Sequence, residues 1–181
     1  VGLVRAALRL LTPGGTLLVR DIYTGSTYSF SGNGAARLGG LVIFGADDGV
    51  HGEEVWASDG TNAGTRLVRD LASSPYFDSY PQQFVTAGNR VFYVAYESDG
   101  NDALYFTDGQ TVTLALDPDV TGLTYLDKLL AGATGVFFED DGGGPVTNIW
   151  WSDGYTYTQL TTFTATDERV DLLGAVTVGD R

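Results

Sequence analysis

Acidic side chains recur where each repeating unit of this sequence predicts a turn between its second and third strands. The richest turn offers oxygen ligands at Glu97, Asp99, Asn101 and Asp102. Calcium prefers carboxylate and carbonyl oxygens on a flexible loop, although this stretch lacks the closing glutamate of an EF-hand. We therefore predict a calcium site at these four residues, with an ordinary solvated hairpin turn as the alternative. The corresponding acidic turns of the neighbouring units read Asp47-Asp48-Gly49 and Glu139-Asp140-Asp141-Gly142.

Aromatic residues gather in the connections that lead from one unit to the next. They are Tyr23, Tyr28, Tyr76, Phe77, Tyr80 and Tyr125. Aromatic rings stack on the C–H faces of sugars while nearby carboxylates bond to the hydroxyls, and exposed rings serve protein interfaces equally well. The sequence predicts that these residues bind a glycan or a protein partner on the face that carries the acidic turns. The alternative is that the rings pack down over the ends of the strands.

Residues for other kinds of catalysis are sparse. His51 is the only histidine, and a single loop histidine beside acids is more often a solvated surface group than a ligand. Cysteine is absent and no Gly-x-Ser-x-Gly stretch occurs, so no nucleophile is recognisable. The paired carboxylates of a glycoside hydrolase need only proximity in space. A glycoside hydrolase or lyase therefore stands as the alternative to a non-catalytic module, and no catalytic residue is assigned.

The elements that must position these residues repeat. An aromatic strand followed by Ser/Thr-Asp-Gly occurs at Val55–Thr61, Leu104–Gln110 and Ile149–Tyr155. The Asp-Gly pairs begin at 59, 108 and 153, so the steps are 49 and 45 residues. In sequence that reads as strands, this period is typical of the four-stranded blades of a β-propeller. The aspartates are predicted to cap turns rather than to act as acids.

The second unit can be divided into four strands with a turn at each joint. The predicted strands are Gln82–Ala87, Arg90–Glu97, Ala103–Thr107 and Thr111–Leu116. The joints contain Gly-Asn or Asp-Gly pairs, which supply the positive φ that hairpin turns require. The third strands of successive units carry an aromatic residue at the same position, at Trp56, Tyr105 and Trp150. Because side chains alternate along a strand, these rings should all face one way and pack between adjacent blades.

The two ends of the chain complement each other. Residues 2–22 read as the last two strands of a blade, joined by Pro13-Gly14-Gly15, and residues 169–181 read as the first two. Together they would complete one blade and remove the free sheet edges. We predict an all-β, four-bladed propeller over residues 1–181, with modules at about 1–22 plus 168–181, 23–72, 73–117 and 118–164. Alternatives are a helix at Gly2–Leu11, a piece of a six- to eight-bladed propeller, or pairing with a second copy.

Composition narrows the class of partner. The chain has 23 acidic and 10 basic residues, a net charge of −13, which repels nucleic acids and anionic membrane surfaces. No apolar stretch is long enough to predict membrane insertion. The absence of methionine predicts that the chain is a mature or excised portion of a longer product.

One module resembles a known repeat. Residues 46–71, ADDGVHGEEVWASDGTNAGTRLVRDL, resemble the repeat of secreted bacterial proteins with a Glu-Leu-Trp-x-Ser-Asp-Gly-Thr core followed by Gly-Thr and Leu-Val-Lys/Arg-Asp. Val55 replaces the usual leucine, and the later modules keep only Tyr/Trp, Asp-Gly and the strand pattern. The resemblance implies an extracellular or cell-surface propeller-like repeat and assigns no reaction. The expected function is a secreted, non-catalytic binding or assembly module, assisted by calcium, whose partner is a protein, a glycan or another copy.

Overall fold

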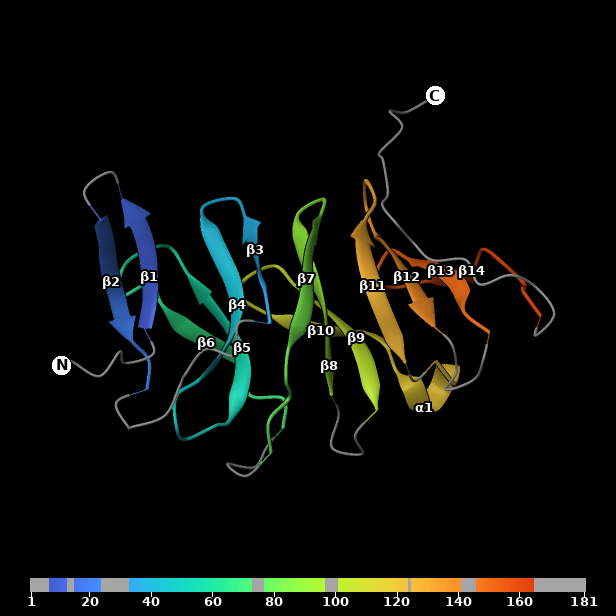
Figure 1. Cartoon of the computed structure of the whole chain (residues 1–181), viewed down its shortest axis with the longest axis horizontal. Helices are drawn as coiled ribbons and strands as arrows, with labels where there is room; N and C mark the ends of the chain where they lie inside the picture. Colours follow the sequence, from blue (N-terminus) through green and yellow to red (C-terminus); the bar gives the residue numbers. More distant parts are fainter. Residues whose placement is uncertain are drawn as a thin grey trace.

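The fold consists of sheets that follow one another along the chain. The computed structural model describes residues 7–12, 15–23, 33–72, 77–96, 101–123, 125–140 and 146–164. These residues form one two-stranded hairpin and three four-stranded antiparallel sheets, with a short helix α1 (Pro118–Thr121) (Figure 1). Within the described residues, no helix has the length and apolar character needed to cross a membrane.

Each four-stranded sheet is a simple meander of consecutive strands. The N-terminal hairpin contains β1 (Ala7–Thr12) and β2 (Gly15–Asp21). The first sheet contains β3 (Ala35–Leu38), β4 (Leu41–Asp47), β5 (Glu53–Ser58) and β6 (Arg66–Arg69). The second contains β7 (Gln82–Ala87), β8 (Arg90–Tyr96), β9 (Asp102–Thr107) and β10 (Val112–Leu116). The third contains β11 (Leu126–Ala131), β12 (Val136–Asp140), β13 (Asn148–Ser152) and β14 (Tyr157–Gln159). The predicted four-stranded antiparallel units are therefore confirmed.

The N-terminal segment is a β-hairpin over its described residues. β1 and β2 pair antiparallel from Ala7 opposite Asp21 to Thr12 opposite Gly15. The prediction of two strands joined at Pro13-Gly14-Gly15 is confirmed over these residues. The alternative helix is wrong from Ala7 onward, because strand pairing outweighs the weak helix preference of alanine and leucine.

The closing blade predicted from the two ends is not shown. Its C-terminal part, residues 168–181, lies outside the described residues. Figure 1 shows the N-terminal hairpin at one end of the row of sheets and the third sheet at the other.

The three Asp-Gly pairs are turns between the third and fourth strands of each sheet. The carboxylates of Asp59, Asp108 and Asp153 each accept hydrogen bonds from the backbone of the turn that follows, at 2.7–2.9 Å. These bonds hold the pKa of each aspartate below its usual value, the strongest coming from the Thr61 side chain for Asp59 and from the Thr111 and Thr156 N–H groups for the other two. The prediction that these aspartates cap turns is confirmed.

Apolar interfaces between successive modules hold the sheets together. Trp56 is 4% exposed and packs with Ile22, which follows the N-terminal hairpin. Tyr105 packs among first-sheet residues such as Val55, and Trp150 packs against the cluster between the second and third sheets. Each ring thus faces the preceding module, as strand alternation predicts. The middle strands β5 and β9 are buried on both faces because a neighbouring module covers each face.

Arginine side chains bridge the same interfaces. The guanidinium of Arg20 donates to the Thr65 carbonyl in the first sheet. Arg69 lies 49 residues later and donates to the Val112 carbonyl in the second sheet at 3.3 Å. At the next interface Arg90 takes this role, donating to the Asp153 carbonyl at 2.7 Å. Because the acceptors are backbone carbonyls, these bridges fix the relative position of the sheets independently of the side chains around the acceptors.

The first strands of successive sheets lie side by side. A residue with positive φ lies at the start of each: Gly34 (106°) immediately precedes β3, whereas Gln83 (55°) lies in β7 and Lys128 (51°) in β11. Their spacings of 49 and 45 residues equal those of the Asp-Gly pairs. Non-glycine residues seldom adopt this conformation. The repeat therefore preserves a positive φ at this position, and in β7 and β11 it coincides with a shift in the pairing register with the next strand.

Candidate functional site

The turns between second and third strands and the connections between sheets share one surface, which we call the connection face. The Asp78 carboxylate of one connection accepts from the Glu53 N–H at 2.6 Å, and the Ser79 carbonyl accepts from the Tyr96 N–H at 2.8 Å. In the next connection the Tyr125 N–H donates to Asp140 at 3.1 Å. The predicted placement of both sets of loops on one side is confirmed for the described residues.

Glycines allow this close approach between connections and turns. Gly49 and Gly52 have φ of 80° and 75° in the first acidic turn. A Cβ on Gly49 would lie 1.9 Å from the ring of Tyr23, and one on Gly52 would lie 2.6 Å from the Phe77 carbonyl. Both positions therefore require glycine for space as well as for backbone conformation.

The predicted aromatic residues divide into exposed and covered groups. Phe77, Tyr80 and Tyr125 are 61%, 44% and 58% exposed. Tyr23 is half-buried and lies against Gly49. The alternative that the rings pack down over the strands is therefore wrong for the first three and partly right for Tyr23. Tyr28 and Tyr76, which were also predicted to bind a ligand, lie outside the described residues.

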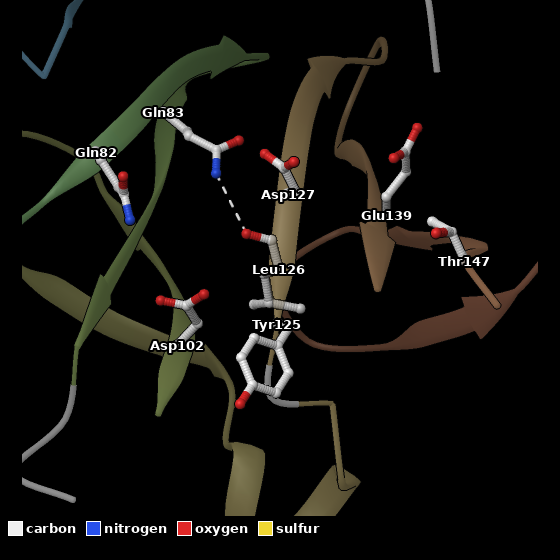
Figure 2. Close-up of a pocket in the computed structure, with 8 residues that line it drawn as sticks. All are labelled: Gln82, Gln83, Asp102, Tyr125, Leu126, Asp127, Glu139 and Thr147. Atoms are coloured by element: carbon white, nitrogen blue, oxygen red, sulfur yellow. Dashed lines mark hydrogen bonds between the residues drawn. The ribbon is translucent and has the colours of Figure 1, made fainter. Parts of the chain in front are cut away.

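A pocket of about 300 Å³ lies between the second and third sheets, beside the connection face (Figure 2). Its lining residues are Gln82, Gln83, Asp102, Tyr125, Leu126, Asp127, Glu139 and Thr147. The structure thus brings together Asp102, predicted as a calcium ligand, and Tyr125, predicted as a ligand-binding aromatic residue. The other lining residues were not predicted as site residues, because only the packing of the third sheet on the second places them together.

Asp102 is the most perturbed carboxylate of the pocket. Burial raises its pKa to about 6, with a smaller contribution from the nearby charge of Asp127, although the Leu126 N–H donates to it. Its Oδ1 atom is buried and has no hydrogen-bond partner among the described residues. Asp102 therefore presents an acceptor to the pocket that the described part of the chain does not satisfy.

Two other polar lining residues are held by the chain itself. The Gln83 amide donates to the Leu126 carbonyl at 3.2 Å and accepts from the Leu129 N–H at 3.0 Å. The Lys128 ammonium lies 3.2 Å from the buried Glu139 carboxylate. These contacts join β7 to β11 and β11 to β12, so they fix the pocket walls.

The acidic turns are less uniform than predicted. Glu139 and Asp140 were assigned to a turn, but both belong to β12 and are buried. Asp102 belongs to β9, because it pairs with Tyr96 across the sheet. These corrections arise because the strands run further toward the connection face than the local sequence indicates.

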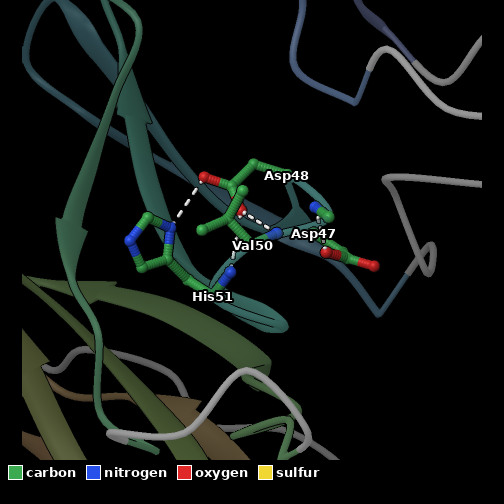
Figure 3. Close-up of polar contacts among 5 residues, drawn as sticks. Asp47, Asp48, Val50 and His51 are labelled. Atoms are coloured by element: carbon green, nitrogen blue, oxygen red, sulfur yellow. Dashed lines mark hydrogen bonds and ion pairs between the residues drawn. The ribbon is translucent and has the colours of Figure 1, made fainter.

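The first acidic turn is closed by its own hydrogen bonds (Figure 3). Asp47 accepts from the Gly49 N–H at 2.6 Å, and Asp48 accepts from the Val50 and His51 N–H groups at 2.9 Å. His51 Nδ1 lies 2.8 Å from Asp48 Oδ2. This bond raises the pKa of His51. Burial acts to raise the pKa of Asp48, but its bonds from His51 and Val50 outweigh burial and lower it. His51 thus takes part in the turn through Asp48.

The predicted calcium ligands are only partly placed. Glu97 and Asp99 lie outside the described residues, whereas Asn101 and Asp102 lie within them. Among the residues that are described, no three acidic or histidine side chains come together to form a metal site.

A second buried carboxylate supports the connection face and was missed by sequence reasoning. Glu54 is fully buried and accepts hydrogen bonds from the Leu71 N–H at 3.0 Å, the Ala72 N–H at 3.2 Å and the Ser79 hydroxyl at 2.7 Å. Burial raises its pKa to about 7 in spite of these bonds. Glu54 therefore binds both described ends of the connection between the first and second sheets to β5.

Neither a protein-family model nor a curated protein matches this chain.

Proposed function

We propose that this chain is a secreted or cell-surface, non-catalytic binding module whose connection face contacts a glycan or protein partner. The observation that carries the proposal is the exposure of three aromatic side chains, Phe77, Tyr80 and Tyr125, on the face that also borders the pocket. These rings expose apolar surface to solvent, and binding of a partner would bury that surface. The resemblance of residues 46–71 to a secreted repeat supports the location.

Aromatic substitution tests the proposal directly. A glycan array and a random-peptide library present both partner classes. The wild type should bind one of them, and the triple variant Phe77→Ser/Tyr80→Ser/Tyr125→Ser should bind at least about tenfold more weakly. Tyr157→Ser is the matched control, because Tyr157 is 44% exposed like Tyr80 but lies on β14. Equal binding by the wild type and the triple variant, or no binding by the wild type, contradicts the proposal.

A second candidate function has one specific observation in its favour. Asp102, whose pKa is raised to about 6, and Asp127 line the same pocket. A protonated carboxylic acid beside a carboxylate is the pair that glycoside hydrolases use. In this candidate Asp102 would protonate the leaving oxygen and Asp127 would act as the base or nucleophile. New reducing ends from an oligosaccharide library, formed by the wild type and not by Asp102→Asn, would support hydrolysis over simple binding.

Calcium belongs to the proposal at Glu97, Asp99, Asn101 and Asp102. An ion that binds only the native state would raise its stability by about 2.7 kcal/mol at a hundredfold excess over the dissociation constant. Melting with calcium and then with chelator measures this effect. An unchanged midpoint removes calcium from the proposal and leaves the aromatic contacts intact.

We further propose that the sheets are blades of a four-bladed propeller, in which residues 1–22 and 168–181 share a blade. The supporting features are the adjacent first strands, the face-to-face packing of successive sheets and the repeated arginine bridges. A disulfide introduced between the two ends tests closure, since it forms within one chain only if those ends meet. Disulfide-linked dimers alone would favour self-association of two copies instead.

A further inference from the structure

We propose that the pocket between the second and third sheets binds a single neutral sugar residue, with Tyr125 stacked on the sugar ring. This inference rests on the proposed function and specifies its ligand, because the pocket borders the connection face. It assigns hydrogen bonding to Asp102, Asp127, Gln82 and Thr147, apolar contact to Tyr125 and Leu126, and a supporting role to Gln83 and Glu139.

The size of the pocket limits the ligand. Its volume of about 300 Å³ is at the lower end of ligand pockets, which range from about 300 to 1,000 Å³. That space suits one sugar ring rather than a longer chain. A glycan would therefore insert one residue and extend along the connection face, toward Tyr80 and Phe77.

The free polar groups of the pocket match sugar hydroxyls. Asp102 Oδ1 is a buried acceptor without a donor among the described residues. Figure 2 shows the Gln82 side chain near Asp102, and the Asp127 carboxylate and the Thr147 side chain on the third-sheet side. A hydroxyl group both donates and accepts, so it can donate to a carboxylate while it accepts from an amide. Hydrogen bonds to a carboxylate are also the stronger kind.

The apolar groups of the pocket complete the match. Tyr125 is 58% exposed, so its ring is available to a ligand, and the Leu126 side chain lies beside it. A sugar presents C–H groups on the faces of its ring and hydroxyls around the edge. Stacking on Tyr125 would therefore turn those hydroxyls toward Asp102 and Gln82.

The charges of the pocket select against other ligands. Asp102 and Asp127 would repel phosphate groups and uronic acids. Glu139 is already paired with Lys128, and the Gln83 amide is already bonded to β11. The acceptors that remain are the carboxylates of Asp102 and Asp127, and they favour an uncharged ligand that donates several hydrogen bonds.

Amide chemical shifts during titration with sugars test the inference. The panel contains neutral disaccharides of glucose, galactose, mannose and N-acetylglucosamine, with glucuronic acid and glucosamine as charged comparisons. At least one neutral sugar should shift the amides of residues 82–83, 102 and 125–127, with a dissociation constant of about 1–10 mM. Glucuronic acid should cause no shift there. If glucosamine alone binds, the pocket is a cation site and the inference is wrong.

Two variants locate the contacts. Tyr125→Ala should weaken binding about tenfold, and Asp102→Asn should weaken it about fivefold or more while keeping an acceptor for the Leu126 N–H. Asp119→Asn is the matched control, because it removes the same charge from an exposed position on α1 and should leave binding unchanged. Equal affinities for Asp102→Asn, Tyr125→Ala and wild type would overturn the inference.

The outcome also separates this inference from the proposed function. If no sugar binds at the pocket but the arrays give a partner that needs Phe77 and Tyr80, the inference fails and the binding module stands. If neither assay gives binding, both fail. If a bound sugar is cleaved during the titration, the ligand class is right and the second candidate function replaces the first.

Discussion

The surroundings of a carboxylate in this chain either lower its pKa or raise it. Asp59, Asp108 and Asp153 lie in turns whose hydrogen bonds stabilise the charged form. Glu54 and Asp102 lie between packed strands, where burial favours the neutral form and raises the pKa. The first three fix local backbone geometry, whereas the last two couple separate parts of the molecule.

Glu54 should make stability depend on pH. Its pKa is raised from 4.5 in the unfolded chain to about 7 in the folded one, so between these values the native state binds the extra proton. The stability that protonated Glu54 contributes is therefore fully present below pH 4.5 and is lost as the pH rises through 7. The loss is about 3 kcal/mol of unfolding free energy, at 1.36 kcal/mol per unit. Urea unfolding of wild type and Glu54→Gln from pH 4 to 8 measures it.

Comparing the wild type with Glu54→Gln isolates the titration of Glu54, because all other acidic residues are the same in the two proteins. The stability of the wild type relative to Glu54→Gln should fall across this range by about that amount. A difference that stays constant with pH would mean that Glu54 titrates normally and is not held neutral between β5 and the connection.

Trp56 should be a major contributor to the interface with the N-terminal hairpin. It is 4% exposed, and the Arg20 guanidinium lies 5.7 Å from its ring centre. Trp56→Ala should reduce the unfolding free energy by about 3–5 kcal/mol, because it leaves a cavity between modules. Tyr157→Ala, at an exposed ring, should cost less than about 1 kcal/mol. Similar losses for the two variants in urea unfolding would show that Trp56 does not join the modules.

Individual elements are held in register by contacts to the next sheet. Arg90, at the start of β8, donates to the Asp153 carbonyl and lies over the rings of Phe106 and Tyr155 at 4.7 and 4.8 Å. Arg90→Ala should therefore cost about 1–3 kcal/mol. Arg37 donates only to the nearby Gly39 carbonyl among the contacts described, so Arg37→Ala should change stability by less than about 0.5 kcal/mol. Equal effects in thermal unfolding would contradict an inter-sheet role for Arg90.

The strands could be predicted from sequence because their signals are local. The second sheet matches its predicted bounds within one residue, since Gly88 and Gly109 mark turns that need positive φ. The pocket could not be predicted in this way. Gln83 and Lys128 share the 45-residue step of the repeat, but the Gln83 side chain finds its partners only because β7 lies beside β11, and Lys128 finds Glu139 on the adjacent strand β12. Of the pocket residues, sequence reasoning found Asp102 and Tyr125, and it assigned Asp102 to a turn.

At the scale of the whole molecule, the three sheets and the hairpin form a row in chain order (Figure 1). Each interface contains one of the repeated aromatic residues Trp56, Tyr105 and Trp150. The connections and acidic turns lie on one side of this row, and the Asp-Gly turns lie at the opposite ends of the third strands. Capped turns therefore recur on one side, and the other side carries the pocket and the exposed rings of Phe77, Tyr80 and Tyr125, although the exposed ring of Tyr155 belongs to an Asp-Gly turn. The net charge of −13 leads us to expect that this surface repels polyanions.

The most direct test of this account is amide hydrogen exchange, followed by mass spectrometry, on the protein with and without the ligand that the arrays or the titration identify. The account predicts slower exchange in segments of the connection face, around Phe77–Gln83, Asn101–Asp102 and Tyr125–Asp127. Exchange at the Asp-Gly turns near Asp59, Asp108 and Asp153 should be unchanged. Protection of those turns, with no change on the connection face, would contradict the account.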